Sequence, residues 1–558
     1  MTATPDPGHS TSLSRSLPVK MNSTPPQTLF PEQSLSRVSS LLAIIAITYL
    51  ILRFLIVVAI AEQFGTGEFA DILFIAQLIP ITLFMQNRRA LFLSFVPVYM
   101  EYVVQRDGKD LWRFTSQFTN LVVLASCVFT VLYVLSAPLL MRVMALGFTP
   151  EQRDQTVQLT RVFSPIILLS MIFAVQESIL YSHKHFTTTN LSSLLVGVGG
   201  LLGVILLTQR YGLFGYAYGS LAGYLLQVLI PCGLFWKYRH RISLSLDLRD
   251  HGLVQVYKLL VPIYILSGAL GLFHITNRAL ASTLGPGRVS AFQYCTTLTW
   301  LLPILLAQAV LAPLFPVISE RTVRNDMEGL KKILRDGSQV LFFAVTPVVT
   351  AVLLLRVPIV QLLFQRGEFS PEDTAMTAGT LLFYSPFILA MTLNLLSSQV
   401  MINLKLAAAA AKLSGLGVLL NLVLCLLFMR FFDVGGIALA TTLAFYLMTW
   451  ISVVLIERKI GSLGLGRLLK PGLKVVLACC LAAIPAYFSM EYLETSWDVS
   501  RLSVRMLALL VEGGSFFGSF ALLAGLFRME EISMLLGLIK TKGQTKKLEL
   551  SVPAIGGG

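Results

Sequence analysis

Long apolar runs recur along this chain, and they restrict what it can fold into more than any other feature. Many are about 20 residues long, enough for a helix rising about 1.5 Å per residue to cross a hydrocarbon core about 30 Å thick. They do not alternate apolar and polar residues as the strands of a membrane barrel do. Only 13% of the 558 residues are charged, against about 25% in soluble domains. The sequence therefore predicts an all-α polytopic membrane protein.

Fourteen apolar runs are long enough to be spans. The expected spans are 41–61, 69–87, 114–136, 159–181, 188–207, 213–235, 259–280, 290–312, 337–355, 375–400, 413–429, 434–456, 472–490 and 504–527. Residues 1–40 and 531–558 are expected to form disordered cytoplasmic tails. No cleavable signal peptide is visible, because the first long apolar run begins only at Leu41.

The distribution of basic residues predicts the orientation. If both termini lie inside, the inner segments hold about 28 of the 43 Lys and Arg residues, and the outer loops hold about nine. Cytoplasmic loops carry such an excess of positive charge. We therefore expect a multi-pass protein of the bacterial inner membrane with both termini in the cytoplasm.

Short motifs repeat in order along the chain, at offsets of 219 to 221 residues. The pairs are Phe64-Gly-Thr-Gly67 and Leu284-Gly-Pro-Gly287, Val96-Pro-Val98 and Phe315-Pro-Val317, Ala137-Pro138 and Val357-Pro358, Phe148-Thr-Pro-Glu151 and Phe369-Ser-Pro-Glu372, Ser164-Pro165 and Ser385-Pro386, and Gly215 to Ser220 and Gly436 to Thr441. Six spans fit in one period, so both copies have the same orientation. The repeat predicts two parallel lobes, 41–250 and 251–471, followed by two additional helices in 472–530. Such repeats place a substrate path between the lobes.

Four arginines lie inside or beside the apolar runs, where a charge costs roughly 3 kcal/mol. Arg53 in the first span could face a wet cavity or form a structural pair. Arg88 and Arg89 either mark the inner boundary of the second span or form a site, and the matching region near Gln308 carries no charge. Arg278 could extend to the outer surface or line a cavity. Because guanidinium groups bind phosphate in a bidentate manner, we expect Arg53, Arg88 and Arg89 to bind a diphosphate and Arg278 to assist from the second lobe.

Two acidic residues are candidates for gating or coupling. Asp71 follows the Gly-Thr-Gly turn, where a helix start favours an acid through the macrodipole, and its counterpart in the second copy is Ala291. Glu177 could pair with an arginine or carry a proton.

Other chemistry is not indicated. The six cysteines all fall inside apolar runs, without the spacing of a metal site or a disulfide framework. We find no phosphate-cradling loop, no nucleophile constellation and no large outer loop. The sequence therefore predicts that the protein is not an enzyme and needs no cofactor or metal.

Several motifs resemble the MurJ/MviN lipid II flippase family, part of a larger exporter superfamily. The resemblance covers roughly residues 41–530 and rests on Phe64-Gly-Thr-Gly with Asp71 and Pro80, Phe95–Glu101, Ser178–Tyr181 with Phe186, Asn277–Ser282 with Gly287 and Ser290, and Leu363–Ser370. It implies two six-helix lobes with alternating access, and it matches Asp71 to an important acidic position and Arg278 to a common Asp/Asn-Arg pair.

Some family features do not carry over. The family usually has an arginine early in the eighth span, and this position is Thr297 here. In the second span, Arg88-Arg89 occupies the position of the Glu-Gly that usually follows an Arg-Arg pair. Arg53 lies about a turn from the family's first-span arginine. The cavity predicted from this resemblance is still cationic, but its charges are rearranged.

The predicted function is a flippase for a polyprenyl-diphosphate-linked glycan, with lipid II as the favoured substrate. An exopolysaccharide or O-antigen-type repeat unit is the alternative. A multidrug exporter would need more carboxylates in the membrane, and a non-transporting scaffold would leave the arginines unexplained. The expected partners are the lipid-linked oligosaccharide, membrane lipids and proteins of cell-wall or polysaccharide assembly, without nucleic acid, and we expect a monomer.

Overall fold

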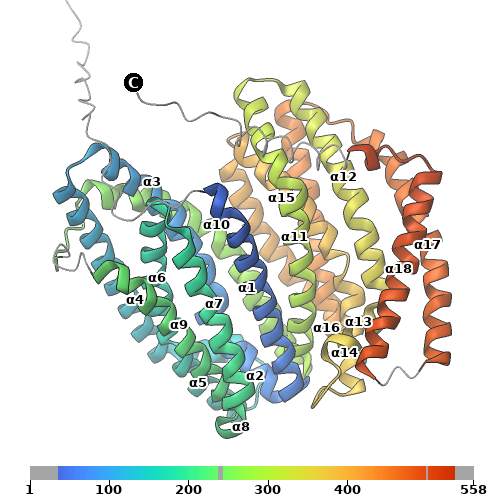
Figure 1. Ribbon diagram of the computed structural model, residues 1–558, viewed down its shortest axis with the longest axis horizontal. Helices are drawn as coiled ribbons and strands as arrows, with labels where there is room; N and C mark the ends of the chain where they lie inside the picture. The colour runs from blue at the N-terminus through green and yellow to red at the C-terminus, as the bar shows by residue number, and fades with distance from the viewer. Residues whose placement is uncertain (1–34, 237–242, 498–500, 535–558) are drawn as a thin grey trace, which may run out of the picture.

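The computed structural model describes residues 35–236, 243–497 and 501–534, and the described residues form helices and no strands. The long helices run side by side between two ends of the bundle (Figure 1). We call the end where α1 starts, at Leu35, the tail side, and the end where α1 finishes, at Phe64, the turn side. Most of the two predicted tails lies outside the described residues.

Residues 35–236 form the first half of the bundle. Its segments are α1 (Leu35–Phe64), α2 (Glu68–Ala76), the π-helical η1 (Leu78–Leu83), α3 (Phe84–Gln105), α4 (Gly108–Met144), α5 (Pro150–Phe163), α6 (Pro165–Ser182), α7 (Phe186–Leu202), the π-helical η2 (Gly203–Leu207), α8 (Thr208–Tyr211) and α9 (Phe214–Phe235).

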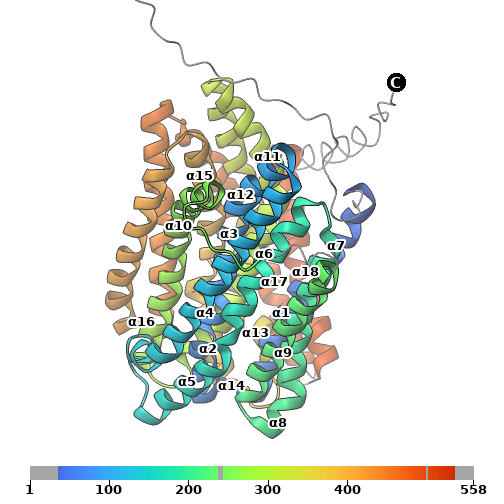
Figure 2. The same cartoon turned by 90° about the vertical axis from the view of Figure 1, so that its left-hand side faces the viewer.

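Residues 251–460 form the second half, and two further helices follow. The segments are α10 (His251–Ala281), η4 (Ser282–Leu284), α11 (Arg288–Val323), α12 (Met327–Leu354), α13 (Arg356–Phe364), α14 (Pro371–Tyr384), α15 (Phe387–Asn403), α16 (Ala407–Ile460), η5 (Leu465–Leu468), α17 (Leu469–Ser496) and α18 (Leu502–Leu526). Figure 2 shows the first half facing the viewer.

The all-helical multi-pass fold is confirmed, but the count of fourteen spans is not. Among the described residues, eleven helices are long and apolar enough to cross a membrane, and a bent pair, Glu68–Ala76 with Leu78–Gln105, makes up to twelve. The 36-residue α11 is outside this count, and the 54-residue α16 is counted once. Fourteen crossings therefore stay a prediction.

The α16 segment is two helices joined by a sharp turn. A straight helix of its 54 residues would be about 80 Å long, far more than a hydrocarbon core of about 30 Å. Phe432 and Asp433 have non-helical dihedral angles. A Cβ atom on Gly436 would lie 2.3 Å from the carbonyl oxygen of Phe428, so the chain folds back on itself here.

Irregular backbone positions recur at the period of the sequence repeat. Gly212 has φ 54° and ψ −134°, and Asp433, 221 residues later, has φ 52° and ψ −138°. Lys184 and Lys405 both have positive φ, at 57° and 61°. The starts of α5 and α14 carry the same capping box, in which a hydroxyl side chain at the N-cap accepts a bond from the backbone three residues on. These matches agree with a duplication, while the exact lobe boundaries remain a prediction.

One helix continues far beyond the end of the span predicted for it. The second span was expected to end at residue 87, but α3 continues through Arg88 and Arg89 to Gln105. The continuation buries Leu91, Phe95 and Tyr99 at a spacing of four, which places them on one face of the helix. Hydropathy falls at the arginines, but the helix has a core to pack against beyond them.

The buried core is continuous on the turn side and divided on the tail side. One cluster joins residues of both halves near the turns, including Phe74, Tyr294 and Phe364. On the tail side, one cluster gathers on α3, α4 and α6 with the start of α10, and another gathers on α11, α12, α15 and α16. The last two helices pack against α12 at the edge of the bundle (Figure 1), through Phe343, Phe516 and Phe520 among others.

Candidate functional site

Asp71 joins the two halves on the turn side. It lies in the first turn of α2 with 1% of its surface exposed. Its Oδ2 accepts a hydrogen bond from the N–H of Gly287 at 2.7 Å, and its Oδ1 accepts one from the N–H of Ser290 at 2.7 Å. These N–H groups begin α11, and a carboxylate is favourable at a helix N-terminus. Asp71 therefore caps a helix of the other half.

Other contacts close the same end of the bundle. The Tyr294 hydroxyl donates to the carbonyl of Gly65 at 2.7 Å, and the hydroxyl of Thr66 donates to the carboxylate of Asp373. Gly65 has φ +58°, and a Cβ there would lie 2.5 Å from the carbonyl oxygen of Glu368. Only glycine suits this position, because its φ is positive and the backbone of the other half lies close to it.

We call the set Gly65, Thr66, Asp71, Gly287, Ser290, Tyr294 and Asp373 the turn-side seal. The nearby Gly147 adds a bond from its N–H to Ser282 Oγ at 3.2 Å. All these bonds connect residues of the first half with residues of the second. The structure is therefore closed between the halves on the turn side.

Arg53 lines a small polar cavity near the seal. The cavity has a volume of about 70 Å³, and Tyr49, Gln77, Tyr216 and Gln293 are among the residues around it. The Tyr216 hydroxyl donates to Gln77 Oε1 at 3.1 Å. Because Gln293 belongs to α11, this cavity is shared by the two halves.

Arg278 reaches the same glutamine from α10. Its side chain is 4% exposed, and its Nη2 donates to Gln293 Oε1. Gln293 Nε2 in turn donates to Thr297 Oγ1 at 3.3 Å. Arg278 Nη1 is buried and has no hydrogen-bond partner among the described residues. Arg278 is therefore buried rather than extended to the surface.

The neighbouring Asn277 fixes the turn-side end of α10. Its Nδ2 donates to Thr441 Oγ1 at 2.9 Å, and its Oδ1 accepts from Asn421 Nδ2 at 2.7 Å. Both partners lie on α16. This amide cluster holds α10 against α16 and so sets the position of Arg278.

Arg88 and Glu177 form an ion pair within the first half. Arg88 Nε lies 2.9 Å from Glu177 Oε2, and Arg88 Nη2 donates to Glu177 Oε1 at 3.2 Å. The guanidinium also lies 5.1 Å from the ring centroid of Phe173. Of the two roles considered for Glu177, the structure shows the pairing with an arginine.

Arg89 lies apart from this pair. It is exposed, and none of the ion pairs found among the described residues includes it. Arg88 and Arg89 are both inside α3 rather than at its end, so they do not mark a helix boundary. The structure thus places Arg53 and Arg278 around Gln293 and gives Arg88 a separate partner.

Sequence reasoning missed the uncharged members of the site. Gln77, Tyr216 and Gln293 line the Arg53 cavity, and a glutamine inside an apolar run was a usable signal, because polar residues within spans face the protein interior. Asp373 was missed because its motif resembles an ordinary capping box, which it also forms.

No metal centre is indicated. Among the described residues, no group of three or more His, Cys, Asp and Glu side chains could hold a metal ion. All six cysteines are free.

Comparison with known proteins gives a family match over most of the chain. The profile of the family described as "Lipid II flippase MurJ" matches residues 60–508. A protein of Synechocystis sp. named "Probable lipid II flippase MurJ" is 25% identical over 522 residues, which cover 90% of this chain and 96% of that protein. The "Lipid II flippase MurJ" of Burkholderia cenocepacia is 24% identical over 334 residues, covering 58% and 65%.

Solved structures show the same fold. The structure titled "Lipid II flippase MurJ, inward closed conformation" has a TM-score of 0.67 at 20% identity and covers 86% of this chain and 100% of its own. An inward-facing multidrug resistance MATE family transporter of the MOP superfamily has a TM-score of 0.63 at 15% identity, covering 75% and 95%. The multi-pass helical fold is therefore shared with both.

Proposed function

The chain belongs to the lipid II flippase MurJ family, and from this premise we propose that it flips a polyprenyl-diphosphate-linked glycan across the bacterial inner membrane. Lipid II is the favoured substrate, and alternating access of the two lobes is the mechanism. Members of the family are transporters rather than enzymes, in agreement with the sequence prediction.

The observation that carries the proposal is the pair of arginines around Gln293. Arg53 and Gln293 both line the polar cavity, and Arg278 donates to Gln293 while keeping a buried N–H group without a partner among the described residues. A buried donor without an acceptor costs about 1–3 kcal/mol. A diphosphate supplies acceptor oxygens in the geometry that guanidinium groups prefer. The head group would therefore bind between the two halves.

The access cycle follows from the closed seal. The excess of Lys and Arg predicts that the tail side is cytoplasmic, so the head group would enter from that side while the seal is shut. Asp71 acts as the gate, because the seal opens only when its two bonds to α11 break. Glu177 pairs with Arg88, and the diphosphate would compete with it for this arginine. Arg89 is exposed and would meet the head group first.

A second candidate substrate is a lipid-linked repeat unit of an exopolysaccharide or O-antigen type. The observation in its favour is Thr297, which accepts a bond from Gln293 at the position where the resemblance leads us to expect an arginine. The site has one guanidinium fewer there, so a different head group could fit.

Complementation tests this function. The wild-type chain, expressed in cells depleted of their own lipid II flippase, is expected to restore growth and lipid II translocation. The double variant Arg53→Ala/Arg278→Ala should lose translocation by about 100-fold or more, since each charged hydrogen bond contributes about 1.5–3 kcal/mol. The control Arg324→Ala removes an arginine whose side chain is 72% exposed and should translocate normally.

Two results would contradict these assignments. Normal translocation by the double variant would remove Arg53 and Arg278 from the site. Failure of the wild-type chain, shown to be in the membrane, would exclude lipid II and favour the repeat-unit substrate.

A further inference from the structure

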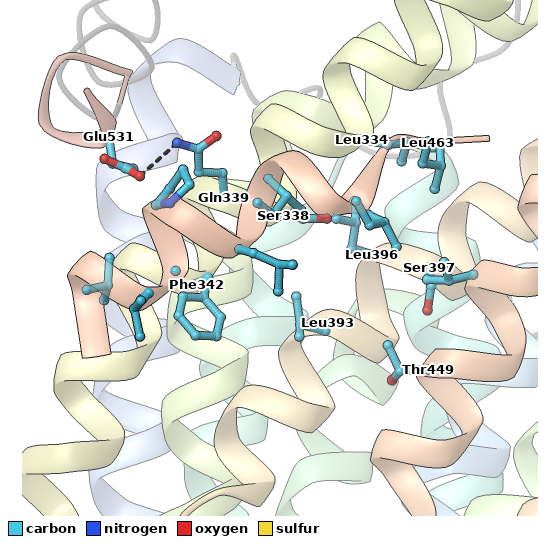
Figure 3. A pocket seen from close by; sticks show the side chains of 18 of the residues that line it. Leu334, Ser338, Gln339, Phe342, Leu393, Leu396, Ser397, Thr449, Leu463 and Glu531 are labelled. Carbon is cyan, nitrogen blue, oxygen red and sulfur yellow. Dashed lines mark hydrogen bonds between the residues drawn. The ribbon is translucent and has the colours of Figure 1, made fainter. Parts of the chain in front are cut away.

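A second and larger cavity lies on the tail side of the second half, apart from the Arg53 cavity. It is lined by α12, α15, α16, η5 and the start of α17, and its volume is about 510 Å³. Sites for small molecules typically have about 300–1,000 Å³. Its walls are mostly leucine and valine, with Phe342 and Leu393 facing its middle (Figure 3). Such walls suit a hydrocarbon chain.

One end of this cavity carries a buried carboxylate. Glu531 is 3% exposed, and Gln339 Nε2 donates to its Oε1 at 2.7 Å. Figure 3 shows the pair at one end of the cavity, away from Ser397 and Thr449. None of the ion pairs found among the described residues includes Glu531. A buried charge is costly unless it is matched by an opposite charge, so a ligand with a cationic group would complete this end.

Basic side chains border the cavity on the tail side. A Cβ atom on Gly461 would lie 3.2 Å from Lys331 Nζ, and one on Gly464 would lie 3.8 Å from Arg335 Nη1. These glycines flank Leu463, which lines the cavity. Lys331 Nζ also lies 2.7 Å from Glu328 Oε1, and Arg335 Nε lies 4.0 Å from Asp336 Oδ1. The cavity therefore presents an apolar interior, one buried anion and a rim on which two basic side chains lie beside acids.

We propose that this cavity binds a membrane phospholipid with a primary ammonium head group. One acyl chain occupies the apolar interior, the ammonium group pairs with the Glu531 carboxylate, and the phosphate faces Lys331 and Arg335. Three features of the cavity thus match three parts of one molecule. An anionic phospholipid would satisfy the rim but supplies no cation for Glu531. A polyprenyl chain would fill the interior and leave Glu531 unmatched.

The bound lipid would pack between α17 and the second half and hold them together. Gly472 and Val475 of α17 form one wall, and residues of α12 and α15 form others. This role is independent of the glycan site, because the two cavities share no lining residue.

Lipid binding to the purified full-length chain tests the proposal. Native mass spectrometry of protein exchanged with phosphatidylethanolamine, phosphatidylcholine and phosphatidylglycerol is expected to show one tightly held phosphatidylethanolamine. Glu531→Gln keeps the shape of the side chain and should reduce the preference for phosphatidylethanolamine by about tenfold. Glu530→Gln is the matched control, because it removes the same charge from an exposed neighbour and should leave the preference unchanged.

A second variant tests the interior. Gly472 lines the cavity, and a Cβ atom there would make only an ordinary contact with Phe342, at 3.6 Å. Gly472→Leu should therefore fold and should displace the acyl chain, with loss of the tightly held phosphatidylethanolamine. Equal binding of phosphatidylglycerol and phosphatidylethanolamine to the wild-type chain, or unchanged preference in Glu531→Gln, would overturn the proposal. Because no transport is measured, the result is separate from the test of the flippase function.

Discussion

On the turn side, buried side chains from both halves form one cluster, in which Phe74 of α2 packs edge-on against Tyr294 of α11 with ring centroids 5.5 Å apart. On the tail side, the buried residues form two clusters, one that includes Phe95 and one that includes Leu341. Within the described part of the chain, the start of α10 is the one segment of the second half in the first of these clusters.

This difference shows which contacts a transport cycle would have to break. The two tail-side clusters share no buried residue, so the contacts that a separation of the halves would break in them are those of the start of α10. The turn-side cluster cannot open without separating apolar surfaces and breaking the polar bonds of the seal. Hydrogen bonds to a charged group contribute about 1.5–3 kcal/mol each, so the Asp71 bonds are a large part of what holds this end closed.

The largest expected effect comes from forcing the turn side apart. A Cβ atom on Gly147 would lie 2.0 Å from the carbonyl oxygen of Ser282. We expect Gly147→Val to keep the turn side open and to abolish translocation, since overpacking costs about 1–3 kcal/mol. The measurement uses Thr297→Cys as a reporter, in a chain whose native cysteines have been replaced. A membrane-impermeant thiol reagent is added on the turn side, and the extent of labelling of this cysteine is measured.

The control for this variant is Gly518→Val on α18, where a Cβ would meet nothing within 4 Å. It should leave labelling and translocation as in the wild type. Protection of the cysteine in Gly147→Val equal to that in the wild type would show that the two halves can close without this contact.

A smaller effect is expected from Asp71→Asn. The asparagine oxygen can still accept a hydrogen bond from one N–H group of α11, but its NH₂ group cannot accept the other. The substitution also removes the negative charge that is favourable at a helix N-terminus. The loss of one charged bond should raise labelling on the turn side by about tenfold. Glu68→Gln changes an exposed acid in the same turn of α2 and should have no effect. Equal labelling of both variants would mean that Asp71 does not hold the seal.

The smallest effect is expected from the ion pair of the first half. Because both partners are only partly buried and lie in one half, a double-mutant cycle of Arg88→Ala and Glu177→Ala should give a coupling free energy of about 1 kcal/mol. Thermal unfolding in detergent measures it. Labelling of the reporter cysteine from the turn side should stay unchanged in each variant. If labelling rose as much as in Asp71→Asn, the ion pair would also hold the turn side closed, against the difference between the two sides described above.

The helical, multi-pass fold could be predicted because hydrophobic runs of span length leave few alternatives. The end of a segment was predicted well where the apolar run and the helix end at the same residue, as at Phe235 of α9. The end of α3 was missed because Leu91, Phe95 and Tyr99 face a core that hydropathy does not register. The turn inside α16 was predicted by the gap between two expected spans.

The site was predicted less fully, because its contacts join residues far apart in sequence. The macrodipole argument placed Asp71 correctly at a helix start, but the helix that its carboxylate caps begins 216 residues later. Arg278 was predicted near the turn-side end of its helix, yet its bond to Gln293 depends on how α10 and α11 pack. A single sequence does not show which residues far apart in the chain contact each other in the fold.

The Asp71 bond also has a consequence for biosynthesis. Asp71 precedes Ser290 by 219 residues (290 − 71). Chains grow at about 5–20 residues per second, so about 10–45 s separate the synthesis of the two partners. During that time the first half stands in the membrane with a carboxylate that has not met its helix end. The carboxylate therefore needs hydrogen bonds from another source, such as water, until α11 emerges.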